Sequence, residues 1–134
     1  MKPIVFVAHP VTGDIRDNLK RYRIVCAALS TAGHPLITWD HLVQAHLDGR
    51  EPESVSHDWY MERTLPLVAR ADVVLAVNAA ESRGAQIEIA EAKSLGIPVV
   101  KLNFDATKGA PSGSGLAVFL AMVLGLKFRK LEDK

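Results

Sequence analysis

The sequence predicts an α/β fold in which a mostly parallel sheet is covered by helices on both faces. Four short apolar runs rich in β-branched residues alternate with longer segments of helical periodicity along the 134 residues. A run without polar alternation is typical of a strand that is buried on both faces, as in a parallel sheet. Because helices join such strands, the alternation predicts βαβ units with right-handed connections.

The expected elements follow in order along the chain. The strands are expected over residues 4–8, 35–39, 73–77 and 97–102, and the helices over residues 14–32, 57–70, 84–95 and 116–126. Gly33 and Gly96 directly follow two of these helices and predict where they end. Pro66 lies inside a third helix and is expected to interrupt or bend it. Residues 41–56 have the weakest pattern and are expected to hold one short helix and a loop.

Length and composition limit the class of protein. A chain of 134 residues suits one domain over residues 1–134, because two halves of this size would each bury too little surface. The net charge of +1 gives no electrostatic case for nucleic acid or an anionic membrane as a partner. No apolar run reaches the roughly 20 residues that a membrane span needs, and no signal peptide is recognisable. We therefore expect a cytoplasmic protein.

The residues that bind metals and form disulfides are sparse. The single cysteine, Cys26, cannot form an internal disulfide, and its apolar setting indicates a buried face of a helix. The histidines lack the spacing of metal ligands. No metal and no cofactor is expected.

Candidate site residues lie where the expected strands end. Parallel sheets of this kind bind ligands beyond the carboxyl ends of their strands. The segments expected there are residues 9–14, 39–40 and 78–84. The first, HPVTGD, joins a strand to a helix and would present backbone N–H groups at the positive end of a helix dipole, which is typical of an anion site. Its candidate binding residues are His9, Pro10, Thr12 and Gly13; an ordinary turn in which Asp14 caps the helix explains the segment equally well.

The most informative stretch is SRGAQIEIAEA, residues 82–92. Ser82 is expected to cap the helix, Arg83 adds positive charge at its start, and Gly84 permits close approach of a ligand. Glu88 lies further along, on a helix face of small and apolar residues. A carboxylate there would be desolvated and suited to act as a nucleophile or general base. The simpler alternative is a glutamate that the helix dipole favours near an N-terminus.

A third segment, DWYMERTL, covers residues 58–65. Trp59 and Tyr60 either stack on the base of a ligand or cover the core, and their spacing alone favours the core.

These segments, taken together and in this order, resemble the nucleoside 2-deoxyribosyltransferase-like superfamily. The resemblance rests on HPVTG, DWYMxxxL, ADVV and the run SRGAxxE…A…LGIPVV, and it spans roughly residues 4–102. It is strongest to a small, often phage-encoded branch in which GPMTG, YMxxDL and SRGAxxE recur. The resemblance implies a flavodoxin-like three-layer sandwich with a four- to five-stranded sheet. It also implies cleavage of an N-glycosidic bond in a nucleoside or nucleotide, by a homo-oligomer of two or more chains.

The resemblance assigns roles to several residues. In that superfamily a glutamate on the helix after the third strand attacks the anomeric carbon, and Glu88 occupies its position. Six residues earlier, enzymes that use free nucleosides carry an aspartate for the 5′-hydroxyl, whereas Ser82 resembles the 2′-deoxynucleoside 5′-phosphate N-hydrolases. An aspartate would repel a phosphate, while Ser82 and Arg83 would bind it. The implied ligand is a nucleoside 5′-monophosphate, with Tyr60 or Trp59 against its base.

Thr64 departs from the family pattern. Relatives place an aspartate directly before the leucine of YMxxDL, where it orients the sugar and the reacting groups. Glu62 does not replace it, because two helical steps turn it roughly 200° away. The departure indicates a different sugar, a slow enzyme, or a non-catalytic nucleotide-binding module with Thr64 still in contact with the ligand. His9 also differs from the glycine that relatives often have, and would narrow the pocket or provide a proton donor.

Overall fold

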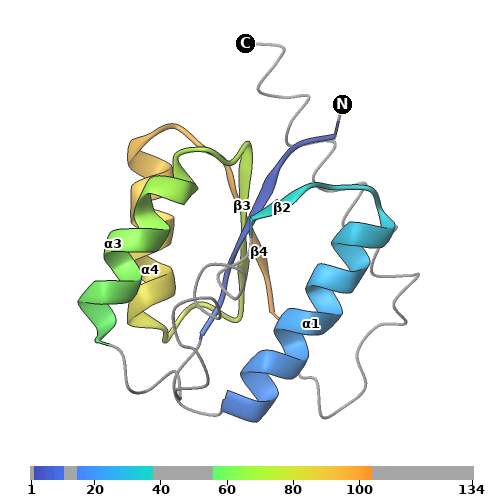
Figure 1. The fold of residues 1–134 in the computed structure, drawn as a ribbon, viewed down its shortest axis with the longest axis horizontal. Coiled ribbons are helices and arrows are strands. Elements are labelled where there is room, and N and C mark those ends of the chain that lie inside the picture. Colours follow the sequence, from blue (N-terminus) through green and yellow to red (C-terminus); the bar gives the residue numbers. More distant parts are fainter. Residues whose placement is uncertain (1, 11–14, 38–55, 104–134) are drawn as a thin grey trace.

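The computed structural model describes residues 2–10, 15–37 and 56–103, and its centre is a four-stranded sheet (Figure 1). The strands are β1 (Val5–Ala8), β2 (Leu36–Ile37), β3 (Val73–Val77) and β4 (Val99–Leu102). They lie in the order β2-β1-β3-β4, and every pair is parallel. This is the strand order of a flavodoxin-like sheet, with the reversal of order between β1 and β3. The α/β fold predicted from the sequence is confirmed.

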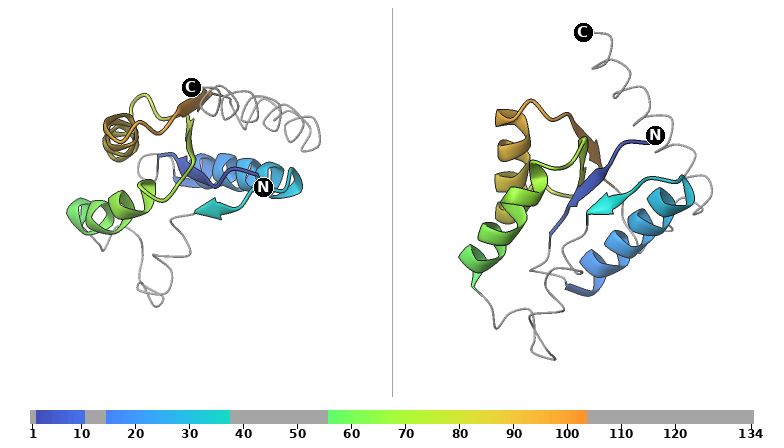
Figure 2. Two further views of the ribbon diagram at one scale, coloured as in Figure 1. Left: turned by 90° about the horizontal axis from the view of Figure 1, so that it is seen from above. Right: turned by 45° about the horizontal axis from the view of Figure 1, so that its top comes forward.

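Helices cover the two faces of the sheet, which gives three layers. Helix α1 (Ile15–Thr31) lies on one face, and α3 (His57–Val68) and α4 (Arg83–Ser94) lie together on the other, as Figures 1 and 2 show. Side chains alternate along each strand, so β1 contributes to two separate cores. Val5 and Val7 pack in the core under α1, whereas Phe6 and Ala8 pack in the core under α3 and α4. Every residue of β1 and β3 is buried, as expected for central parallel strands.

Most element boundaries lie within two residues of those predicted. Gly33 and Gly96 adopt φ of +87° and +73°, the left-handed conformation that ends a helix. Helix α3 is not interrupted at Pro66, since it continues to Val68. The proline lies in the last turn and is exposed, so the backbone groups that it leaves unpaired can reach solvent. Strand β4 begins directly after Pro98, two residues later than expected.

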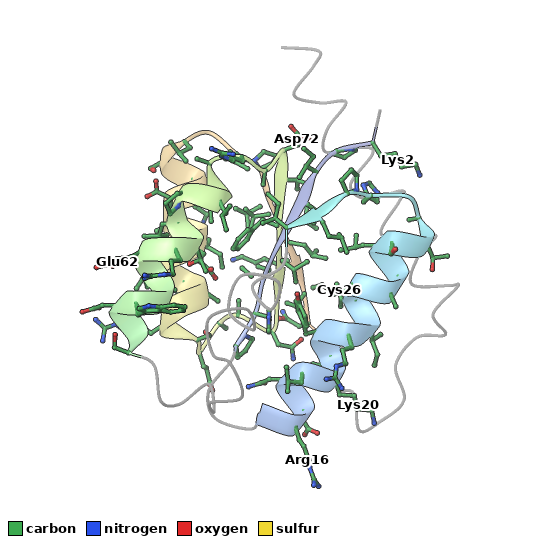
Figure 3. All side chains as sticks on the ribbon, in the orientation of Figure 1. Lys2, Arg16, Lys20, Cys26, Glu62 and Asp72 are labelled. Atoms are coloured by element: carbon green, nitrogen blue, oxygen red, sulfur yellow. The ribbon has the colours of Figure 1, made fainter. Side chains whose placement is uncertain are left out.

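A hydrogen bond ties the start of β1 to the start of β3. The backbone N–H of Ile4 donates to Asp72 Oδ2 over 2.7 Å, which fixes the start of β1 beside the start of β3. Cys26 is half-buried and packs against the core under α1 (Figure 3).

No helix in the described ranges is long and apolar enough to cross a membrane. The expected helix 116–126, the segment 41–55 and the end of the second strand lie outside the described residues.

Candidate functional site

The carboxyl edge of the sheet is formed by the ends of β1 and β3 and the start of α4. His9 and Pro10 follow β1, and residues 78–82 join β3 to α4. Because β1 and β3 are neighbours, these two segments lie side by side, as predicted for the switch point. Thr12 and Gly13, the other candidates from the first loop, lie outside the described residues.

Ser82 begins α4 as its N-cap. The backbone N–H of Ala85 donates to Ser82 Oγ over 3.2 Å, so the predicted cap is confirmed. Arg83 is the first helical residue and is exposed, and Gly84 follows it in the first turn. Within the described part of the chain no carboxylate forms an ion pair with Arg83. Ser82 and Arg83, the two residues expected to bind a phosphate, therefore lie together with Gly84 at the positive end of α4.

Hydrogen bonds hold the loop that leads into α4. Gln86 Nε2 donates to the carbonyl oxygen of Ala79 over 2.9 Å, and the N–H of Ser82 donates to the same oxygen over 3.1 Å. The N–H of Asn78 donates to the carbonyl oxygen of Leu102 over 2.9 Å. Asn78 has a φ of +46°, a left-handed conformation that asparagine tolerates better than most residues. These bonds fix the direction in which the first N–H groups of α4 point.

Glu88 lies in the buried stripe of α4. The stripe consists of Ala85, Glu88, Ile89 and Ala92, and its apolar members belong to the core that α4 shares with α3 and the sheet. Glu88 is buried, with only 7% of its surface exposed to solvent. Burial raises the pKa of the Glu88 carboxyl from 4.5 to about 8, because a charge is costly away from water. At neutral pH the carboxyl of the free protein is therefore mostly protonated.

Thr64 of α3 faces Glu88 across the contact between the two helices. The Thr64 side chain is 3% exposed. Its hydroxyl favours the charged form of Glu88 and so lowers the pKa, but this effect is smaller than that of burial. Thr64 Oγ1 has no hydrogen bond of regular geometry, so the contact is a close approach rather than a well-aligned bond. Thr64, where the sequence departs from the expected motif, therefore lies beside Glu88 in this fold.

Glu62 does not take the place of that aspartate. Its side chain is exposed on α3 and points away from the sheet in Figure 3. It lies 3.8 Å from Arg63, whose guanidinium carbon is 4.0 Å from the centre of the Trp59 ring. Trp59 is half-buried, so its outer face carries the Arg63 guanidinium while part of its surface is covered by the protein. The Tyr60 side chain lies outside what the structure describes.

Residues 3–102 match the family model of a domain of unknown function, DUF7768. The chain belongs to this family. No curated protein matches its sequence significantly. Among solved structures, this DUF7768 chain is similar to a 2-deoxyribosyltransferase from the psychrotolerant bacterium Bacillus psychrosaccharolyticus, with a TM-score of 0.56 and 19% sequence identity. The similarity covers 75% of this chain and 72% of that enzyme, and it shows a shared fold.

The DUF7768 structure separates His9 from Glu88. The His9 ring stacks on Tyr22 of α1, with 4.2 Å between ring centroids and 24° between planes. Its Nδ1 donates to the carbonyl oxygen of Pro10 over 2.9 Å, so the hydrogen of the ring is on that nitrogen. Because side chains alternate along a strand, His9 lies on the same face of the sheet as Val5 and Val7, the face that α1 covers. Glu88 lies on the other face.

Sequence reasoning missed polar residues that lie near the edge of this DUF7768 sheet. Asn18 and Tyr22 occupy the inner face of α1 and are 5% and 3% exposed. The helical spacing of Asn18, Tyr22 and Val25 is the only signal in the sequence that places them on one face. Asn78 and Gln86, which fix the loop before α4, carry no distinctive pattern. In the described ranges no group of three His, Cys, Asp or Glu side chains is arranged to hold a metal ion.

Proposed function

We propose that this protein cleaves the N-glycosidic bond of nucleoside 5′-monophosphates, as a hydrolase or a deoxyribosyltransferase, with Glu88 as the nucleophile. The observation that carries the proposal is the buried Glu88 carboxyl in α4, the helix that follows the third strand. The N-terminus of the same helix is suited to bind a phosphate. The fold shared with a 2-deoxyribosyltransferase supports this class of reaction.

The start of α4 would bind the 5′-phosphate. It offers backbone N–H groups at the positive end of the helix, the Arg83 guanidinium and the hydroxyl hydrogen of Ser82. Ser82 and Glu88 are six residues apart, which is about 9 Å along a helix axis. Helical side chains point back toward the N-terminus, so the Glu88 carboxyl lies closer to the phosphate than its Cα does. One nucleotide can therefore place its phosphate at the cap and its sugar beside Glu88.

The reaction would take place in two steps. The ionised Glu88 carboxylate attacks the anomeric carbon, a C–O ester bond forms, and the C–N bond breaks with its electron pair leaving on the base, which takes a proton from solvent. Water, or another base, then attacks the same carbon and gives a proton back to solvent, and the ester C–O bond breaks to release the carboxylate. Because the free carboxyl is mostly protonated at neutral pH, the fraction of protein ready to react increases as the pH rises toward 8.

Base release tests the proposal directly. Wild type, Glu88→Gln and the control Glu91→Gln are incubated at pH 7 and pH 8 with a panel of ribo- and deoxyribonucleoside 5′-monophosphates. Glu91 lies on the same helix outside its buried stripe, so this control changes the same chemical group elsewhere. We expect release by wild type and Glu91→Gln and none by Glu88→Gln. The absence of free base with every nucleotide would refute the enzymatic proposal.

A second candidate is a nucleotide-binding module without catalysis. Thr64 favours it, because the carboxylate that relatives carry beside the nucleophile is a neutral hydroxyl here. A ligand that binds only the folded state at 100 times its dissociation constant stabilises the protein by about 2.7 kcal/mol. Thermal stabilisation by a nucleoside monophosphate without base release would therefore identify the module.

The assembly of the protein is part of the proposal. We infer from the resemblance that it forms a dimer or larger homo-oligomer. Size-exclusion chromatography with light scattering tests this inference, and a mass of 14.6 kDa in solution would refute it.

A further inference from the structure

A cluster of polar side chains lies on the α1 side of the carboxyl edge, on the face of the sheet opposite Glu88. Helix α1 begins at the edge where β1 ends, so its first two turns lie beside His9 (Figure 1). The His9 ring stacks on Tyr22, and Asn18 lies one helical turn before Tyr22 on the same face of α1. All three side chains are buried, although the core under α1 is otherwise apolar.

Arg21 extends this cluster toward the carboxyl edge. Its Nη2 donates to Asn18 Oδ1, and Asn18 lies one turn closer to the start of the helix. Helical side chains point back toward the N-terminus, so this bond draws the guanidinium toward the edge where β1 ends. Arg21 is half-buried, whereas Arg16 and Arg23 of the same helix are exposed. The cluster therefore includes one cation that the protein holds in a defined orientation.

The Nε–H group of Arg21 is a buried donor without an acceptor in the described part of the chain. Its Nε has no hydrogen-bond partner there. The ion pair found among the described residues joins Arg63 to Glu62, so no described carboxylate neutralises Arg21. A buried N–H of a charged group is costly when it stays unpaired, and such donors in native proteins usually have a partner. An acceptor from outside the chain would supply one.

We propose that Arg21 binds an oxyanion, either a phosphate or a carboxylate, at this side of the carboxyl edge. The planar guanidinium donates in a fixed geometry that matches both anions, and Nε–H would donate to one of the oxygens. Asn18 positions the guanidinium through Nη2. Because Arg21 and Glu88 lie on helices that cover opposite faces of the sheet, this site does not rest on the proposed function of Glu88.

The Nε–H group of Arg21 itself provides the test. Nitrogen-15 NMR follows the arginine Nε–H signals of the full chain during titration with sodium phosphate, with sodium acetate, and with sodium chloride at matched ionic strength. Arg21→Gln identifies the resonance. We expect a saturable shift with phosphate, with acetate or with both, and no comparable shift with chloride. The anion that produces the shift distinguishes a site for phosphate groups from a site for carboxylates.

Variants test which side chain binds the anion, with the backbone N–H signal of Asn18 as the common readout. Affinity should fall about tenfold in Arg21→Gln, because hydrogen bonds from a charged donor are lost. Arg21→Lys keeps the charge without the planar fork, and its affinity should lie between those of wild type and Arg21→Gln. Arg23→Gln removes an exposed arginine of the same helix, and Arg83→Gln alters the start of α4; both should bind like wild type.

Two kinds of result would overturn the proposal. One is the absence of a saturable shift with either anion, or a shift that chloride reproduces. The other is wild-type affinity in Arg21→Gln, or a loss of binding in Arg83→Gln that would place the anion at the start of α4. If Arg21→Gln does not fold, the titrations of wild type and Arg21→Lys decide. Because no nucleotide is present, a failure to release base leaves these results intact.

Discussion

The Glu88→Gln variant should gain stability relative to wild type as the pH rises. The folded protein holds this carboxyl with a pKa of about 8, whereas the unfolded chain has the ordinary value of 4.5. A raised pKa in the folded state means that the folded protein keeps its proton while the unfolded chain loses it. The free energy of unfolding contributed by Glu88 is therefore fully present below pH 4.5 and is lost progressively as the pH rises to about 8.

The size of the effect follows from the same two values. Each pH unit between them changes the free energy of unfolding by about 1.4 kcal/mol. Between pH 5 and pH 8 wild type should therefore lose about 3.5 kcal/mol relative to the glutamine variant, which has no proton to lose at this site. The side chain is only 7% exposed, so solvent screening reduces this figure little.

Urea denaturation followed by circular dichroism at pH 5, 6, 7 and 8 provides the assay. The difference in unfolding free energy between Glu88→Gln and wild type should grow steadily with pH, and Glu91→Gln provides the comparison with a glutamate outside the buried stripe of α4. A difference for Glu88→Gln that does not change over this range would refute the conclusion that burial holds the carboxyl protonated.

Three further predictions concern the edges of the sheet and the start of α4. Ser82→Ala removes the N-cap and should lower the free energy of unfolding by about 1 kcal/mol in the same urea assay, whereas Ser94→Ala, at the other end of the helix, should cost less. Asp72→Ala removes the acceptor for the backbone N–H of Ile4 and should cost about 1 kcal/mol, because it leaves that partly buried donor unpaired. Arg83→Gln should weaken the binding of nucleoside 5′-monophosphates several-fold in calorimetry and leave nucleosides unaffected; equal losses for both ligands would contradict a phosphate contact.

The elements around Glu88 were the most predictable part of the fold. An unbroken apolar run defines β3, and a serine cap, buried spacing and a final glycine define α4, so local signals agree there. Strand β2 is less clear because its described part is only two residues long and half-buried. The sequence suggested that Glu88 is desolvated, since its helix neighbours are small and apolar.

The remaining features depend on contacts between distant elements. That Thr64 faces Glu88 follows from how α3 and α4 pack, and helix packing is not encoded in either segment alone. The alternation of side chains along β1 places His9 on the same face as Val5 and Val7. Only the three-dimensional fold identifies that face as the one under α1. Polar Asn18 and Tyr22 occupy an inner helix face that hydrophobic periodicity alone does not detect.

The hydrogen bonds of the loop before α4 have a consequence for how a ligand would associate. Gln86, Ser82 and Asn78 anchor this loop at both ends without any ligand. An anion that binds at the start of α4 therefore meets donors that are already oriented, and little backbone entropy is lost as the complex forms. Loss of the Gln86 hydrogen bond in Gln86→Ala would therefore weaken anion binding by raising the entropy lost on binding, although Gln86 itself would not touch the anion.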